Sequence, residues 1–190
     1  MTDATTETAS PSPAGERRWR DDLHLAHTIA DQVDPLTRGH FEAQDVEVET
    51  KPDLTPVTAA DREAERLIRD YLSRARTRDS VLGEEFGVTG HSPRQWIIDP
   101  IDGTKNFVRG VPVWATLISL VEDGRVVVGL ASAPALGKRW WAVAGGGAWS
   151  GRSLALAHQL HVSGVTALED ASLSYSSLSG WAERRRLRGM

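Results

Sequence analysis

A short apolar run that ends abruptly in a charged turn constrains this chain more than any other feature of its sequence. Residues 96–98, Trp-Ile-Ile, have the character of a buried strand, and the segment DPIDG follows at 99–103. Its two carboxylates are three residues apart, and Pro100 stiffens the turn between them, so each can reach a separate cation. The backbone carbonyl between them is a further hard oxygen ligand. Such ligands favour Mg²⁺ or Mn²⁺ over zinc.

The residues after this turn suit a phosphate ligand. Gly103 lets the backbone approach a ligand closely, and a helix that begins there would offer free N–H groups to a phosphate. Hydrolysis of a phosphate monoester needs such an arrangement because the dianion repels a nucleophile. Cations neutralise the phosphate and lower the pKa of a bound water, while a hydroxyl and a carboxylate orient that water.

Two further acidic groups stand at the ends of expected elements. Asp61 lies at a helix start, and Glu84 and Glu85 follow a strand. Strand ends and helix starts can aim several side chains at one point. Both acidic groups also have a simpler interpretation: Asp61 can be part of a capping box with Thr58, and the Glu pair can be a solvated turn. Lys105, which follows Gly103 and Thr104 and could bind a phosphate, can likewise be a solvated side chain.

The order of expected elements predicts an α+β domain. A helix is expected around residues 23–33 and to end near Pro35, a short strand at Val46 and Val48, and a second helix around residues 64–72. Further strands are expected at 80–82, 96–98, 115–121, 125–131 and 140–143, where Asp123-Gly124 is a strong hairpin signal. Helices should therefore pack against a mostly antiparallel sheet.

Composition and charge exclude several classes of site and argue against nucleic-acid and membrane partners. The 190 residues have a formal charge of -4 and no cysteine, which excludes disulfides, thiolate metal sites and a cysteine nucleophile. No basic bias favours nucleic acid, and no apolar run suits a membrane, so a cytoplasmic protein is the default expectation. Residues 1–15 are expected to be a disordered tail, residues 16–164 an α+β domain, and residues 165–190 the beginning of an incomplete α/β domain.

Three motifs in this order resemble the inositol monophosphatase-like phosphatases: DLTPVTAAD at 53–61, GEE at 83–85 and WIIDPIDGTKNF at 96–107. The resemblance implies an α/β/α/β/α layered fold, a homodimer and two or three Mg²⁺ ions, with Mn²⁺ as the alternative. It implies that the first metal is bound by Glu84, Asp99 and the Ile101 carbonyl, and the second by Asp99 and Asp102. Asp61 and Thr104 would orient the water, and the substrate would contact Glu84, Asp102, Gly103, Thr104 and Lys105.

One departure from the family pattern bears on activity. The family's later Trp-Asp motif, whose Asp completes the second metal site, is absent after Thr104. The chain is therefore expected to be a fragment or a truncated and inactive remnant, and a regulatory module that uses the N-terminal tail is a further alternative. Within the family, FVRGVPVWATLISL at 107–120 is similar to actinobacterial histidinol-phosphatases. This implies histidinol phosphate as the substrate, with inositol monophosphate as the alternative.

Overall fold

The computed structural model describes residues 18–43, 48–50 and 56–174. The chain divides into two compact units, residues 1–160 and residues 161–190. The first unit holds the sheet and the long helices. In the second, the described part contains a single 3₁₀ turn, Leu168–Asp170, and no strand. The sequence of residues 171–175 suggests the start of a strand, but the described residues 171–174 form none. The sequence of residues 181–187 suggests a helix, and this segment lies outside the described residues.

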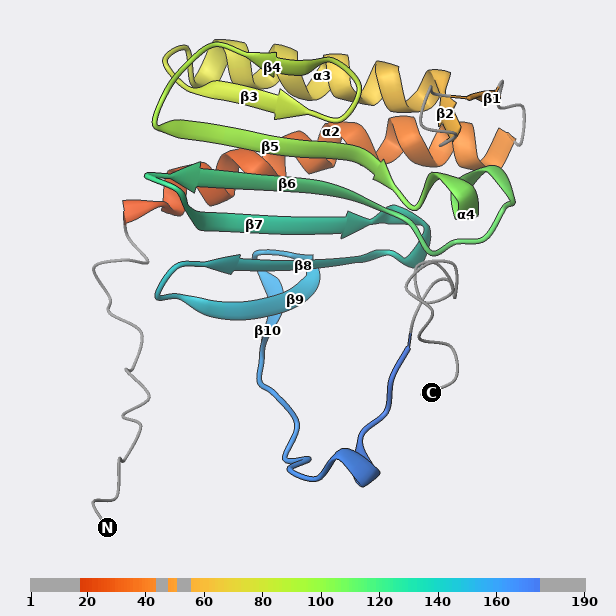
Figure 1. Ribbon diagram of the computed structural model, residues 1–190, viewed down its shortest axis with the longest axis vertical. Coiled ribbons are helices and arrows are strands. Elements are labelled where there is room, and N and C mark those ends of the chain that lie inside the picture. The colour runs from red at the N-terminus through yellow and green to blue at the C-terminus, as the bar shows by residue number, and fades with distance from the viewer. Residues whose placement is uncertain (1–17, 44–47, 51–55, 175–190) are drawn as a thin grey trace, which may run out of the picture. The chain divides into compact units, whose positions relative to one another are not determined.

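An eight-stranded mixed sheet is the larger of the two sheets in the first unit (Figure 1). Its strands lie in the order β10-β9-β8-β7-β6-β5-β3-β4, all antiparallel except that β3 runs parallel to β5. The bounds are β3 Ser80–Gly83, β4 Gly87–Thr89, β5 Arg94–Asp102, β6 Ala115–Glu122, β7 Arg125–Ala133, β8 Lys138–Val143, β9 Gly147–Ser153 and β10 Leu156–Leu160. The α+β expectation is confirmed.

The β6–β7 hairpin follows the sequence signal directly. Asp123 and Gly124 both have positive φ, 51° and 76°, as a two-residue turn with the twist of the flanking strands requires. Strands β9, β10 and β4 were not expected. They are short or rich in glycine and polar residues, so their pairing with neighbours determines them more than their own pattern does.

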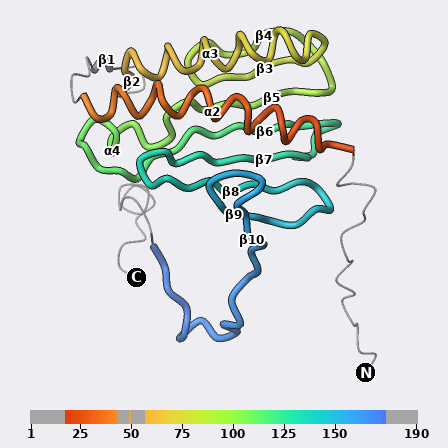
Figure 2. Tube along the Cα trace, turned by 180° about the vertical axis from the view of Figure 1, so that it is seen from behind, coloured from red at the N-terminus to blue at the C-terminus, as the bar shows by residue number. Residues whose placement is uncertain are grey.

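Two helices, α2 (Arg20–Ala43) and α3 (Ala59–Ala75), lie side by side across one face of the sheet (Figures 1 and 2). Their apolar stripes meet the inward-facing strand residues in the main core, where several large side chains are fully buried. This core includes Ile29, Val33, Ile68, Leu72, Trp96, Ile118, Leu120 and Val128. Burial of this amphipathic face is what stabilises both helices.

Helix α2 corrects one expectation, because it continues through Pro35 to Ala43. A proline inside a helix loses one hydrogen bond and costs about 3 kcal/mol. The turns beyond it offset this cost by packing. The Thr37 side chain is fully buried and donates to the Val33 carbonyl at 3.0 Å, and Phe41 packs against a second apolar cluster.

A small two-stranded sheet precedes α3. Strand β1 (Val48–Thr50) pairs antiparallel with β2 (Pro56–Thr58). The expected strand is therefore present at Val48, while Val46 lies outside the described residues. Thr58 then caps α3, and the capping box with Asp61 is confirmed.

A second apolar cluster positions the short helix α4 (Thr104–Val108) beside the end of β5. Phe107 and Trp114 meet edge to face at 4.9 Å between ring centres, and Phe41 lies 5.6 and 5.5 Å from them. Ala60 at the start of α3 and Ile101 in β5 complete the cluster. It therefore joins the C-terminal half of α2, the start of α3 and the segment that follows β5.

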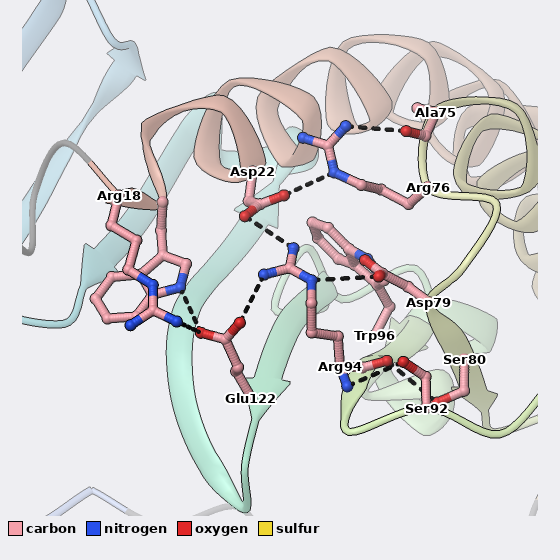
Figure 3. Close-up of polar contacts among 11 residues, drawn as sticks. Arg18, Asp22, Ala75, Arg76, Asp79, Ser80, Ser92, Arg94, Trp96 and Glu122 are labelled. Atoms are coloured by element: carbon pink, nitrogen blue, oxygen red, sulfur yellow. Dashed lines mark hydrogen bonds and ion pairs between the residues drawn. The ribbon is translucent and has the colours of Figure 1, made fainter.

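The start of β5 is fixed by a polar network around Arg94 (Figure 3). Its guanidinium donates to three carboxylates at 3.0–3.2 Å, those of Asp22, Asp79 and Glu122. These partners come from α2, from the residue before β3 and from β6. Strand β5 therefore begins in a structural ion network and ends at the acidic residues Asp99 and Asp102.

Candidate active site

The parallel pairing of β3 with β5 brings two predicted metal ligands together. Gly83 is registered with Ile98, so the next residues along the two strands, Glu84 and Asp99, emerge at the same edge of the sheet. The two carboxyl groups interact, since Glu84 raises the pKa of Asp99 both by its charge and by a hydrogen bond. This is the convergence of strand ends that the sequence predicts.

Asp99 lies at the centre of the acidic group. Burial is the main cause that raises its pKa to about 8, and the charges of Glu84, Asp102 and Asp61 add to it. Its Oδ1 is buried and has no hydrogen-bond partner among the described residues. A buried carboxylate without a hydrogen-bond donor or a cation beside it is unfavourable. A bound cation would compensate the charge of this oxygen, which makes Asp99 a candidate metal ligand.

Asp61 is held by the first turn of α3. Its Oδ2 accepts the Thr58 N–H at 2.8 Å and the Thr58 hydroxyl at 2.5 Å, so the capping box leaves Oδ1 for another partner. Burial, the largest cause, raises the pKa of Asp61; the Thr58 bonds oppose it and the charge of Glu84 adds to it. The capping and functional interpretations of Asp61 are thus compatible.

Residues 99–102 of the DPIDG segment form a bulge inside β5 and not a turn after the strand, which corrects the expectation. Asp99 pairs with Leu117 and Asp102 with Ala115, so three steps on β5 face two on β6. Such a bulge bends a strand and redirects its groups. Pro100, which has no N–H, lies in the bulge, and its carbonyl accepts the Thr116 hydroxyl at 2.8 Å.

The Ile101 carbonyl and Thr104 hydroxyl are neighbours. Thr104 Oγ1 donates to Ile101 O at 3.1 Å, while the Ile101 side chain is fully buried. Asp102, the last residue of β5, is exposed. The predicted carbonyl ligand and the predicted water-orienting hydroxyl therefore lie together, three residues apart.

Gly103 makes the step from β5 into α4. Its φ is 93°, and a Cβ there would lie 3.1 Å from the Val113 carbonyl oxygen, so both conformation and space require glycine. Its own carbonyl accepts the N–H of Asn106 and Phe107. The N–H groups of Thr104 and Lys105 precede these bonded amides, and the Lys105 side chain is exposed.

These residues fit a hard cation. In the described part of the chain no group of three or more carboxylate or imidazole side chains lies in a geometry that could hold a metal ion. Mg²⁺ usually takes only one or two carboxylates and completes its shell with carbonyls, waters and phosphate oxygens. The pair Glu84 and Asp99, with the Ile101 carbonyl nearby, provides such a donor set.

Two supporting residues were missed by sequence reasoning. Thr116 holds the bulge through Pro100, and Glu65 contacts the turn that carries Glu84. Glu65 had a detectable signal, since a charged residue between Ala64 and Ile68 interrupts the apolar face of α3. Thr116 had none, because its partner is fixed only by the register of β5 and β6.

Comparison with known proteins identifies the family and the class of fold. Residues 19–189 match the inositol monophosphatase family, so the chain belongs to this family and the expected resemblance is confirmed. A solved structure described as Thermotoga maritima IMPase is similar, with a TM-score of 0.71 and 33% identity over 88% of this chain and 65% of that one.

More specific relatives are two proteins named histidinol-phosphatase. The one from Streptomyces coelicolor is 66% identical over 90% of this chain, and the one from Mycobacterium tuberculosis is 61% identical over 85%. The chain spans 66% and 63% of their respective lengths. Among the described residues, no helix is long and apolar enough to cross a membrane.

Proposed function

We propose that this chain carries the metal-binding part of the active site of a Mg²⁺-dependent phosphatase that hydrolyses a small phosphate monoester. The observation that carries the proposal is Asp99, whose buried Oδ1 lacks a partner in the described structure. Burial raises the pKa of this carboxyl, and three other carboxylates add to the effect. Membership of the inositol monophosphatase family supports the same class of reaction.

The proposed ligands divide between two cations. Glu84, Asp99 and the Ile101 carbonyl would hold the first, and Asp99 with Asp102 the second; two or three ions bind in all, with Mn²⁺ as the alternative to Mg²⁺. When bound, such cations neutralise the phosphate and activate a water molecule.

The chain's own residues would orient that water. Thr104 donates its hydroxyl hydrogen to the Ile101 carbonyl, so its lone pairs are free to accept a hydrogen bond from the water. Asp61 would accept the proton through its carboxylate. Its raised pKa brings the group nearer to the working pH, where a general base is most effective.

Substrate contacts are proposed at the start of α4. The backbone N–H groups of Gly103 and Thr104 would bind the phosphate, with the exposed Lys105 ammonium reaching it from outside. Glu84 and Asp102 would border the rest of the substrate. We propose L-histidinol phosphate as the substrate, which yields L-histidinol and phosphate and serves histidine biosynthesis; the two proteins named histidinol-phosphatase support this choice. The working enzyme is proposed to be a homodimer.

Phosphate release tests the proposal. The 190-residue chain and a chimaera, in which residues 1–174 replace the matching part of the Streptomyces coelicolor relative, are assayed with millimolar-scale Mg²⁺. The chimaera should release phosphate from histidinol phosphate, and its Asp99→Asn variant should not. If the chimaera prefers inositol 1-phosphate, the proposal of histidinol phosphate as the substrate is wrong, and inositol 1-phosphate replaces it. No release from either ester, with the unmodified relative active, would overturn the proposal in favour of a non-catalytic remnant.

A further inference from the structure

A buried carboxylate on α3 binds the turn that carries Glu84. The Glu65 side chain has no exposed surface. Its Oε2 accepts the backbone N–H of Glu85 at 2.7 Å, and its Oε1 accepts that of Phe86 at 3.2 Å. These are the two residues directly after Glu84 in the turn between β3 and β4. Glu65 is therefore bonded to the backbone immediately beside a proposed metal ligand, without being a ligand itself.

A second residue on α3 completes the attachment. Arg69, one helical turn after Glu65, donates Nε–H to its Oε1 at 2.7 Å and so compensates the buried charge. The same guanidinium donates to the Gly87 carbonyl at 2.5 Å and to the Thr89 hydroxyl at 2.8 Å. The pair thus holds both the turn and strand β4, and planar guanidinium geometry makes this attachment directional.

The turn itself is shaped for this carboxylate. A Cβ on Gly83, the residue before Glu84, would lie only 2.0 Å from Glu65 Oε1. The φ of Gly83 is not in the left-handed region, so close approach of the carboxylate, and not backbone conformation, requires glycine here. The Arg66 guanidinium also contacts this turn, since it lies 5.1 Å from the centre of the Phe86 ring.

We propose that Glu65 is a positioning residue that fixes the Gly83–Phe86 turn and thereby aims Glu84 at the cation beside Asp99. The proposal rests on the proposed function, since it takes Glu84 as a metal ligand. A carboxylate that accepts two consecutive backbone N–H groups leaves the turn little freedom. Residues that orient a metal ligand in this way typically change metal affinity by about 10- to 100-fold when replaced.

Glu65→Gln is the test variant, because it keeps the shape but turns one acceptor oxygen into an amide donor that faces a backbone N–H. Two readouts are measured on the 190-residue chain: hydrogen exchange at the Glu85 and Phe86 amides without metal, and Mg²⁺ affinity by titration calorimetry. Exchange at both amides should become faster, and Mg²⁺ affinity should fall about 10- to 100-fold.

Two control variants separate positioning from general effects. Glu63→Gln removes a carboxylate from the same helix, but this one is 55% exposed and bonds His40. Ile68→Val loosens the main core close to Glu65 on the same helix. Both should leave Mg²⁺ affinity and the two amides unchanged, whereas a merely structural Glu65 would behave like Ile68→Val.

The outcomes are separable from those of the proposed function. Unchanged Mg²⁺ affinity in Glu65→Gln, with binding measurable in the original chain, overturns the positioning role. If the original chain binds no Mg²⁺, the metal assignment fails, and exchange at Glu85 and Phe86 alone decides whether Glu65 fixes the turn. If Glu65→Gln does not fold, Arg69→Lys is measured instead, because it loses the guanidinium contacts to Gly87 and Thr89. It must show faster exchange at the two amides and weaker Mg²⁺ binding, each to a smaller extent, or the proposal fails.

Discussion

The hydroxyl of Thr104 donates to the carbonyl of Ile101 at 3.1 Å, joining a proposed water-orienting group to a proposed metal ligand. We predict that Thr104→Ala in the chimaera lowers kcat by about 10²–10⁴-fold, the usual contribution of a positioned proton-transfer partner. Mg²⁺ affinity should change little, because the carbonyl itself remains. Steady-state kinetics at saturating Mg²⁺ measure the effect.

Thr104→Ser is the matched variant, since it keeps the hydroxyl and loses only a methyl group. It should retain most of the activity. A large loss of Mg²⁺ affinity in Thr104→Ala with unchanged kcat would contradict the assigned role.

Asp99 should make the metal-free protein less stable at high pH. Its folded-state pKa of about 8 lies above the ordinary value of 3.8, so the folded state keeps a proton that the unfolded chain releases. This contribution to stability is greatest below pH 4, declines as pH rises towards 8, and is lost above 8. Asp99→Asn, which is always neutral, should remove this pH dependence.

The measurement is thermal unfolding of both proteins in chelator between pH 4 and 9. At pH 8.5 Asp99→Asn should be more stable by on the order of 2 kcal/mol after allowance for solvent screening, a rise in Tm of about 4–8 °C. With Mg²⁺ added, only the original protein should gain stability. Equal Mg²⁺ stabilisation of both would show that Asp99 is not a ligand.

What the sequence could and could not predict follows from the range of the interactions. The Asp123-Gly124 hairpin and the Thr58–Asp61 cap depend on residues within three positions, and both were predicted correctly. The continuation of α2 through Pro35 was not, because burial of Thr37 and Phe41 against distant elements decides it.

The features of the candidate active site also separate into those set by local sequence and those set by distant contacts. The two carboxylates of the DPIDG segment indicate cation binding from the sequence alone. That residues 99–102 form a bulge depends on their pairing with β6, which no local pattern reveals. The role of Glu65 was missed for a similar reason, since its backbone partners are 20 and 21 residues away. Convergence of Glu84 and Asp99 was expected from strand ends in general, and the parallel register of β3 and β5 supplies it.

Gly103→Ala should damage both stability and turnover. The left-handed φ of 93° and the 3.1 Å approach to the Val113 oxygen give an expected loss on the order of 1–3 kcal/mol. Displacement of the α4 start should also lower kcat in the chimaera. Gly39→Ala is the control: it lies inside α2, and a Cβ there would have no atom of the described residues within 4 Å, so the substitution should stabilise by up to about 1 kcal/mol.

Arg94→Met should destabilise the fold without affecting the chemistry. The guanidinium lies among carboxylates whose side chains are 7–14% exposed. Without it, Asp22 still pairs with Arg76, and Glu122 still pairs with Arg18. The loss should therefore be about 1.5–3 kcal/mol, the contribution of hydrogen bonds to charged groups, and below that of a fully unpaired buried charge. Denaturant unfolding at pH 7 measures the loss. Arg74→Met, which breaks only the exposed pair with Asp70, should cost less than about 0.5 kcal/mol. Equal effects of the two substitutions would show that the Arg94 network contributes no more than a surface ion pair.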